Sequence, residues 1–166
     1  VTELSELKEA VAWHIHSASA KLRAQGSFAG AIYVFLQTNR YKPNQSQYHP
    51  CLATALSEPT QDTLQLTQQA IASLEKIFKP DYCYKKTGIV LLDLQNKAQQ
   101  QASFFDDEAA QQQSEKAMVL MDQINQKFGK NTLRSAATGI GHSWKTKSEN
   151  KSPSYTTSWK ELPEVK

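Results

Sequence analysis

The sequence lacks most of the features that mark a secreted disulfide-rich domain or a membrane protein. Its 166 residues include only two cysteines, Cys51 and Cys83, which do not form a short pair with the spacing of metal ligands. We therefore expect neither a disulfide framework nor a zinc site, and a reducing cytoplasm suits the chain best. No apolar run approaches the length needed to cross a bilayer.

Motifs that would support catalysis are also missing. The sequence has no glycine-rich phosphate loop, no nucleophile elbow and no metal-binding helix of the histidine–glutamate type. His14 and His16 are two residues apart, so on a helix they point about 200° apart, and we expect surface or boundary positions for both. The consecutive acids Asp106 and Asp107 are interpreted as solvated charge. We predict that this chain contains no active site, metal or cofactor.

Charge of neither sign dominates the chain. Lysines and arginines number 19 against 16 acids, a balance that does not by itself indicate a nucleic-acid-binding protein. The distribution is uneven, because acids prevail over residues 98–126 whereas bases prevail over residues 127–160. This predicts a basic C-terminal segment that follows an acidic linker.

Apolar periodicity predicts an α+β fold. A helix with apolar residues every three or four positions runs from Leu4 to Leu22 and ends before Gly26. Strands are expected over 31–37 and 51–56, and the continuous apolar run within 84–94 predicts a central strand. A second helix should end before a proline at position 80, and its expected apolar positions are Leu64, Thr67, Ile71, Leu74 and Phe78.

This α-β-β-α-β order predicts a small sheet with two helices on one face. A β-α-β-β-α-β unit would have one more strand at its start, and the chain does not begin with methionine, so we expect a fragment that lacks the first strand. Ser114 should cap a third helix that ends at Gly129, and a short strand over 132–137 should follow. That strand, or a second copy of the chain, could pair with the sheet edge. The remaining tail is expected to be mostly irregular.

Two adjacent aromatic residues, Phe104 and Phe105, stand in the most polar part of the chain. Such rings either pack back on a neighbouring domain or bind in a partner's pocket, because a glutamine-rich segment cannot form a core of its own. Together with Gln101, Ala102 and Ser103 they form the pattern Gln-x-x-Phe-Phe, which is typical of a peptide anchor.

Basic residues cluster in two places in the first part of the chain. Lys85 and Lys86 open the last predicted strand, and because strand side chains alternate, the two should point to opposite faces. Arg40 and Lys42 follow the first predicted strand. All four could hold a phosphate backbone at one sheet face or edge. The alternative is that they only keep the surface soluble.

The end of the chain resembles a known family. Residues 152–166, which read SPSYTTSWKELPEVK, are similar to the terminal signature of UmuC-type proteins, the family of the catalytic subunit of DNA polymerase V. LMDQIN at 120–125 resembles the preceding part of the same C-terminal region. EPTQDT at 58–63 and YKKTGI at 84–89 resemble the family's little-finger domain.

This resemblance to a Y-family translesion polymerase implies three parts. Residues 1–97 would be the little finger, 98–113 a flexible linker with a clamp-binding motif, and 114–166 the UmuC-like C-terminal region. In this family the little finger holds template-primer DNA with its sheet toward the major groove. The implied DNA-binding positions are Thr38, Asn39, Arg40, Lys85 and Lys86.

The linker and the tail are implied to bind proteins. Residues Gln101 to Phe105 occupy the place of the family's sliding-clamp-binding peptide, although Ala102 and Phe104 both stand where leucine is commoner. The tail would bind the processed UmuD dimer or the RecA filament.

The family's polymerase chemistry uses palm-domain acids and two Mg²⁺ ions, which would precede Val1. The resemblance thus implies a non-catalytic fragment of an error-prone polymerase of the SOS response to DNA damage. The alternative is a protein-interaction module without DNA contact of its own.

Overall fold

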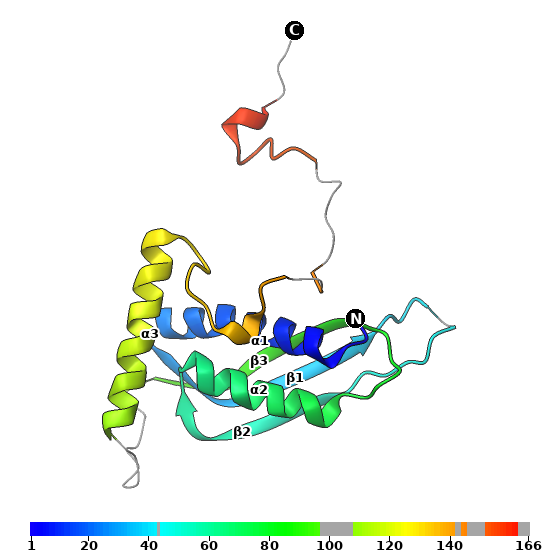
Figure 1. Cartoon of the computed structure of the whole chain (residues 1–166), viewed down its shortest axis with the longest axis horizontal. Coiled ribbons are helices and arrows are strands. Elements are labelled where there is room, and N and C mark those ends of the chain that lie inside the picture. Colours follow the sequence, from blue (N-terminus) through cyan, green and yellow to red (C-terminus); the bar gives the residue numbers. More distant parts are fainter. Residues whose placement is uncertain (43, 97–107, 142–143, 146–151, 163–166) are drawn as a thin grey trace.

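A computed structural model describes residues 1–42, 44–96, 108–141, 144–145 and 152–162. The elements, in chain order, are α1 (Leu4–Ala24), β1 (Ser27–Thr38), β2 (Cys51–Thr60), α2 (Thr63–Ile77), β3 (Tyr84–Asn96) and α3 (Glu108–Phe128) (Figure 1). Two 3₁₀ turns follow, η2 (Ala136–Thr138) and η3 (Trp159–Glu161). None of the helices in these described ranges is long and apolar enough to cross a membrane.

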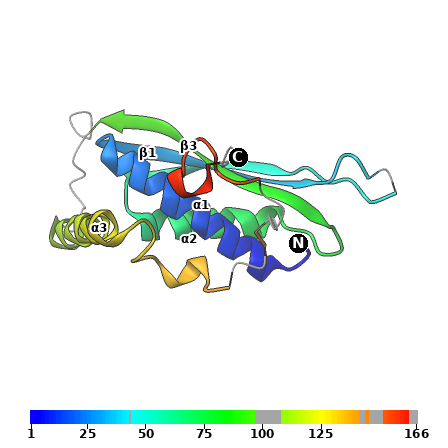
Figure 2. The ribbon, with the colours of Figure 1, turned by 90° about the horizontal axis from the view of Figure 1, so that it is seen from above.

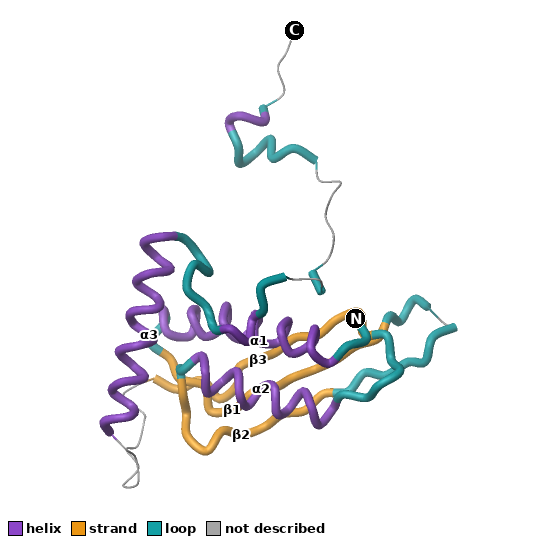
Figure 3. Tube along the Cα trace, viewed as in Figure 1, coloured by secondary structure: helices purple, strands orange, loops and turns teal. Residues whose placement is uncertain are grey.

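The sheet has three antiparallel strands in the order β2-β1-β3. Helices α1 and α2 lie together on one of its faces (Figures 2 and 3), so the predicted α+β fold with two helices on one face is confirmed. The main chain of Val1 exchanges two hydrogen bonds with that of Tyr84, which places the N-terminal residue beside β3. The prediction of a central strand over 84–94 is wrong for this sheet, because β1 is central and β3 lies at an edge.

Helix α1 forms as its periodicity predicts. Leu7, Val11 and Ile15 recur on one face and are buried against the sheet, and basic residues in the last turn suit the negative end of the helix dipole. The chain then turns through Gly26, whose φ of +68° favours a residue without a side chain.

Helix α2 buries most of the predicted face, including Thr67 and Leu74, but not its first position. Leu64, an expected core residue, is 56% exposed, whereas Leu66, Ala70 and Ile77 are buried. Several hydroxyl residues share the buried face, and their side chains find partners there, as in the 3.0 Å hydrogen bond between Ser73 and a β2 threonine. A buried face lined by hydroxyls is not visible in an apolar pattern.

Helix α3 begins at Glu108, so the prediction that Ser114 caps it is wrong. The Ser114 hydroxyl instead donates to Asp62, whose other carboxylate oxygen accepts from the main-chain amides at the start of α2. Buried Met118 and Met121 lie on the same helix. Helix α3 therefore packs on the sheet domain (Figure 1).

The predicted strand over 132–137 is also wrong. The side chain of Asn125 binds both main-chain groups of Leu133 at 2.8 Å, and Ser135 caps the η2 turn. These bonds occupy groups that a strand would need. The segment lies against α1 and not at the sheet edge, which also excludes it as the predicted added strand.

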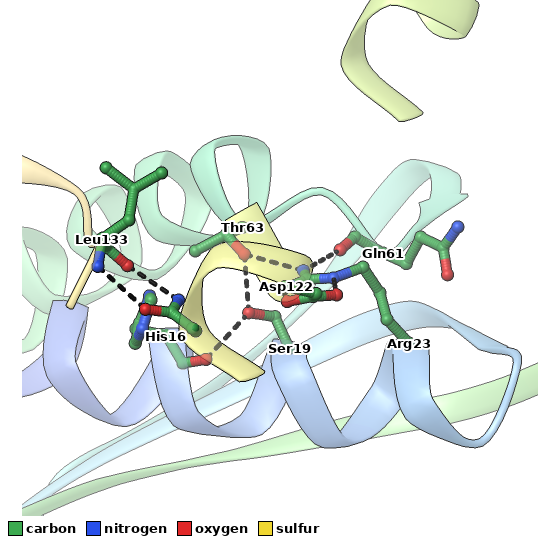
Figure 4. A network of polar contacts seen from close by, with 8 residues as sticks. His16, Ser19, Arg23, Gln61, Thr63, Asp122 and Leu133 are labelled. Carbon is green, nitrogen blue, oxygen red and sulfur yellow. Dashed lines mark hydrogen bonds and ion pairs between the residues drawn. The ribbon is translucent and has the colours of Figure 1, made fainter. Parts of the chain in front are cut away.

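A buried ion pair joins α3 to α1 (Figure 4). Arg23 donates to both carboxylate oxygens of Asp122, at 2.6 and 2.7 Å. Its third nitrogen, Nη1, donates to the Thr63 hydroxyl at 2.8 Å and to the Gln61 carbonyl oxygen at 3.0 Å. The Arg23 side chain is only 5% exposed. One guanidinium thus connects α1, the start of α2 and α3, in the two-pronged geometry that makes arginine–carboxylate pairs strong.

His16 is buried beside this ion pair, contrary to the expected surface or boundary position. Burial lowers its pKa, the positive charges of Arg23 and Arg134 lower it further, and Asp122 acts in the opposite direction. Its ring nitrogen Nδ1 is buried and has no hydrogen-bond partner among the described residues. The imidazole is therefore held in its neutral form.

We predict that the Arg23–Asp122 pair is coupled in a double-mutant cycle. Arg23→Met and Asp122→Leu should each destabilise the chain, and the coupling free energy from urea unfolding should be about 1–3 kcal/mol, since Arg23 is buried but Asp122 is partly exposed. The pair of Lys8 and Glu75 is the control, because neither side chain is buried as Arg23 is: they are 34% and 48% exposed. Its coupling should stay below about 1 kcal/mol. Equal coupling of the two pairs would contradict the assignment.

We also predict that stability falls in mild acid because of His16. Its pKa in the folded chain lies below the ordinary value of about 6.5, so the unfolded chain binds the proton more readily. The stability from neutral His16 is present above about pH 6.5 and is lost as the pH falls below it. In urea unfolding at several pH values, His16→Leu should reduce this acid dependence, whereas the exposed-site control His49→Gln should not. An unchanged acid dependence in His16→Leu would refute the prediction.

Candidate nucleic-acid interface

One face of the sheet is covered by no helix of the described residues. Because side chains alternate along β1, Ile32, Val34 and Leu36 are buried beneath α1 and α2, while Tyr33 and Phe35 point to the other face. The register continues this open face onto both neighbouring strands. Its partners on β3 are Gly88, Val90 and Leu92, and those on β2 are Cys51, Ala53 and Ala55.

Aromatic rings cover the middle of the open face. Phe35 is paired with Gly88, and a Cβ atom on Gly88 would lie 2.5 Å from the Phe35 ring. The glycine therefore lets the ring lie flat across β3. The Tyr33 ring is 6.1 Å from that of Phe35. A side-chain hydrogen bond with Cys51 is the main cause that raises the pKa of Tyr33, so its hydroxyl stays protonated at neutral pH.

Lys86 marks the end of this face. It is exposed and paired with Gln37, which puts it on the same side as Phe35, and its ammonium group lies 5.8 Å from the Phe35 ring centroid. Lys85 lies at an irregularity in the pairing of β1 with β3: Gln37 is paired with Lys86 and Thr38 with Tyr84, so the register passes over Lys85. It reaches the β1–β2 loop, where its ammonium group is 5.8 Å from the ring centroid of Tyr41.

The end of β1 holds the other residues that the sequence indicated. Thr38 is buried, and its hydroxyl donates to Gln47 at 3.0 Å and accepts from the Tyr48 amide at 3.1 Å. The Asn39 side-chain oxygen accepts a hydrogen bond from the main-chain amide of Tyr41, at 3.2 Å. Arg40 is exposed in the loop. The register pairs Thr38 with the residue before Lys85, so these positions share one end of the sheet.

The two predicted sites stand differently in the structure. The DNA-binding candidates of β1 and β3 are brought together at one end of the sheet, although the Thr38 hydroxyl is engaged within the loop. The predicted clamp-binding residues Gln101, Ala102, Ser103, Phe104 and Phe105 lie outside the described residues.

Sequence reasoning missed the aromatic part of the open face. The run Ala31–Gln37 is apolar at nearly every position, so it indicated a strand without showing which residues face away from the core. Only the alternation of buried residues with Tyr33 and Phe35 reveals it. The Gln47 contacts could not have been found, because a glutamine in a polar loop gives no pattern.

The arrangement suits an extended polyanion better than a small substrate. Four cations stand at one end of a flat, partly aromatic face, and they come from β3 and the β1–β2 loop: Arg40, Lys42, Lys85 and Lys86. Such cations can neutralise successive phosphates, while the flat face can lie in a groove.

Comparison with known proteins places both parts of the chain. Residues 1–104 match the impB/mucB/samB family C-terminal domain, and residues 115–165 match a domain of unknown function, DUF4113. The chain is 34% identical over 166 residues to Protein UmuC of Salmonella typhimurium, covering all of this chain and 39% of that protein.

Other relatives give the same picture. Identity is 34% over 163 residues to Protein MucB of Escherichia coli, covering 98% of this chain and 38% of the relative. It is 32% over 166 residues to Protein SamB of Salmonella typhimurium, covering 100% and 39%. The chain thus spans about two fifths of the length of these curated relatives. It belongs to the impB/mucB/samB family, and the sheet domain with the open face is that family's C-terminal domain.

Proposed function

We propose that this chain is the non-catalytic C-terminal part of an error-prone translesion DNA polymerase of the SOS response, and that it holds DNA and the sliding clamp. The family membership and the relatives named UmuC and MucB support this reading. Polymerase chemistry and its Mg²⁺ ions would belong to a palm domain elsewhere in the full-length protein. The work would take place in the cytoplasm, where free cysteines such as Cys51 and Cys83 stay reduced.

The DNA-binding proposal rests on one observation. The sheet face without helices ends in Lys86, and Lys85 extends the same end toward the loop that carries Arg40. A duplex carries one phosphate charge per roughly 1.7 Å of its axis, so cations grouped in this way can meet several phosphates at once.

The residues would divide the work. Lys85, Lys86 and Arg40 would contact phosphates directly, because all three are exposed. Thr38 would keep the loop in shape, since its hydroxyl is bonded to Gln47 and to the Tyr48 amide. Such contacts position a duplex without reading its sequence, which suits a polymerase that must act at any site.

The clamp and the other proposed partners involve the second part of the chain. Residues 101–105 would form the clamp-binding peptide, with Phe104 and Phe105 entering an apolar pocket. The tail carries exposed aromatic rings, with Trp159 90% and Tyr155 47% exposed. Rings at such positions suit a partner-binding segment, and the processed UmuD dimer and the RecA filament are the proposed partners.

The proposed phosphate contacts predict how DNA affinity depends on salt. Binding of a fluorescent primer-template should weaken as salt rises, and Lys85→Gln with Lys86→Gln should reduce the slope of log affinity against log salt by about 2, since each phosphate contact contributes roughly 0.9. The control removes the same charge from the opposite layer through Lys21→Gln with Lys76→Gln, at exposed positions in the last turns of α1 and α2. Equal slopes for both double variants would reject the proposed phosphate contacts. Absence of any DNA binding at low salt would favour the protein-interaction alternative.

The proposed clamp-binding peptide predicts that the chain binds the sliding clamp through two rings. Immobilised sliding clamp should capture the chain, and Phe104→Ala with Phe105→Ala should weaken capture at least tenfold, because two buried rings are worth roughly 1.5–3 kcal/mol each before ordering costs. The matched control is Tyr155→Ala with Trp159→Ala, which removes two rings from the tail. Unchanged capture of the Phe104 and Phe105 variant would eliminate the clamp assignment.

A further inference from the structure

We propose that the ring of Tyr41, at the tip of the β1–β2 loop, stacks on an unpaired base of single-stranded DNA beside the bound duplex. This inference rests on the proposed DNA-binding function and adds a contact to it. Tyr41 is 89% exposed, the most exposed tyrosine among the described residues. A single exposed aromatic residue is ordinary on a protein surface. Three properties of the loop set this one apart.

The first property is that hydrogen bonds join the described residues of the loop. The two N–H groups of the Gln47 side-chain amide are shared among the carbonyl oxygens of Asn39, Lys42 and Gln45, which lie 3.0–3.2 Å from its nitrogen. The Gln47 carbonyl oxygen accepts from the Thr38 hydroxyl. The Tyr41 amide is itself bound by the Asn39 side chain. The ring therefore projects from described loop residues that hydrogen bonds already join, which reduces the entropy lost on binding.

The second property is the charge around the ring. Arg40 and Lys42 flank it in sequence, and the Lys85 ammonium group lies 5.8 Å from its centroid. No acid occurs from residue 37 to residue 57. A phosphodiester chain that follows these cations would bring its bases to the ring, as in proteins that bind single strands through a basic path with aromatic platforms.

The third property is position. The β1–β2 loop reaches beyond the ends of α1 and α2 (Figure 2), so the helical layer does not cover it. It lies at the same end of the sheet as Lys85, which leads onto the open face. DNA that extends from the open face beyond Lys85, at this end of the sheet, would therefore reach Tyr41.

An unpaired base is the ligand that fits best. In a duplex, neighbouring base pairs cover both faces of each internal base, so away from the duplex ends a ring on a loop can stack only where the partner strand is absent. A peptide partner would have to be acidic to suit the cations, and it would also need an aromatic side chain beside its acids, whereas every nucleotide carries a charge and a π face together. Since every base has a π face, the contact requires no particular sequence.

The experiment compares two DNAs and three variants of the full chain. Fluorescence anisotropy would measure binding to a blunt duplex and to the same duplex with a single-stranded 5′ template overhang containing 2-aminopurine. The wild-type chain should bind the overhang DNA more tightly and quench the 2-aminopurine. Tyr41→Ala should weaken overhang binding about tenfold, abolish the quenching and leave blunt-duplex binding within about twofold. Tyr41→Phe should retain both properties, because the ring is kept.

The control is Phe128→Ala, which removes an exposed ring that also lies beside a lysine, at the end of α3, and should behave as wild type. If Tyr41→Ala binds and quenches the overhang DNA as wild type does, while duplex binding remains salt-sensitive, the stacking inference alone is overturned. An equal loss on blunt and overhang DNA would also overturn it, since that result indicates a duplex contact. If the wild-type chain binds neither DNA, the proposed DNA-binding function fails and the inference falls with it.

Discussion

The position of the C-terminal region depends on the guanidinium of Arg23. This group is nearly buried. It donates hydrogen bonds to Asp122 of α3, to Thr63 at the start of α2 and to a carbonyl oxygen after β2. A buried cation without these acceptors would be strongly destabilising. The cluster therefore requires α3 to lie against α1. Because Asp122 belongs to the DUF4113 region and Arg23 to the family's C-terminal domain, the two matched regions share one interface.

The rest of the C-terminal region extends this contact along α1. Leu133 is held by Asn125 of α3, η2 follows against α1, and the Trp144 ring packs edge-on against Trp13 at 6.4 Å. This cover explains why His16 is buried on a helix that would otherwise expose it. Residues 108–141 thus lie against the helical layer and not on the open sheet face (Figure 2).

The sequence was sufficient to predict those features that follow from apolar residues repeating every two to four positions. The α1 helix, its end near Gly26 and the layer of two helices on a sheet could be predicted, because each depends on neighbouring residues. The hydroxyl part of the buried face of α2 could not, since buried Thr63 and Ser73 are satisfied by partners on other elements. The apolar run of β3 was misleading: Val90 and Leu94 are 43% and 51% exposed at an edge. Of the site, the lysines were found from composition, whereas the ring of Phe35 over Gly88 needed the register.

The described residues that flank the proposed clamp peptide lie at the end of the sheet opposite to the proposed DNA contacts. The loop with Arg40 stands at one end, and Asn96 and Glu108, between which the proposed clamp peptide is connected, stand at the other (Figures 1 and 2). The 13 residues of β3 separate the ends by about 40 Å. Over such a distance substitutions at the two sites should act additively. A clamp bound at one end would leave the cations at the other end accessible, so the two proposed contacts can hold the same DNA at once.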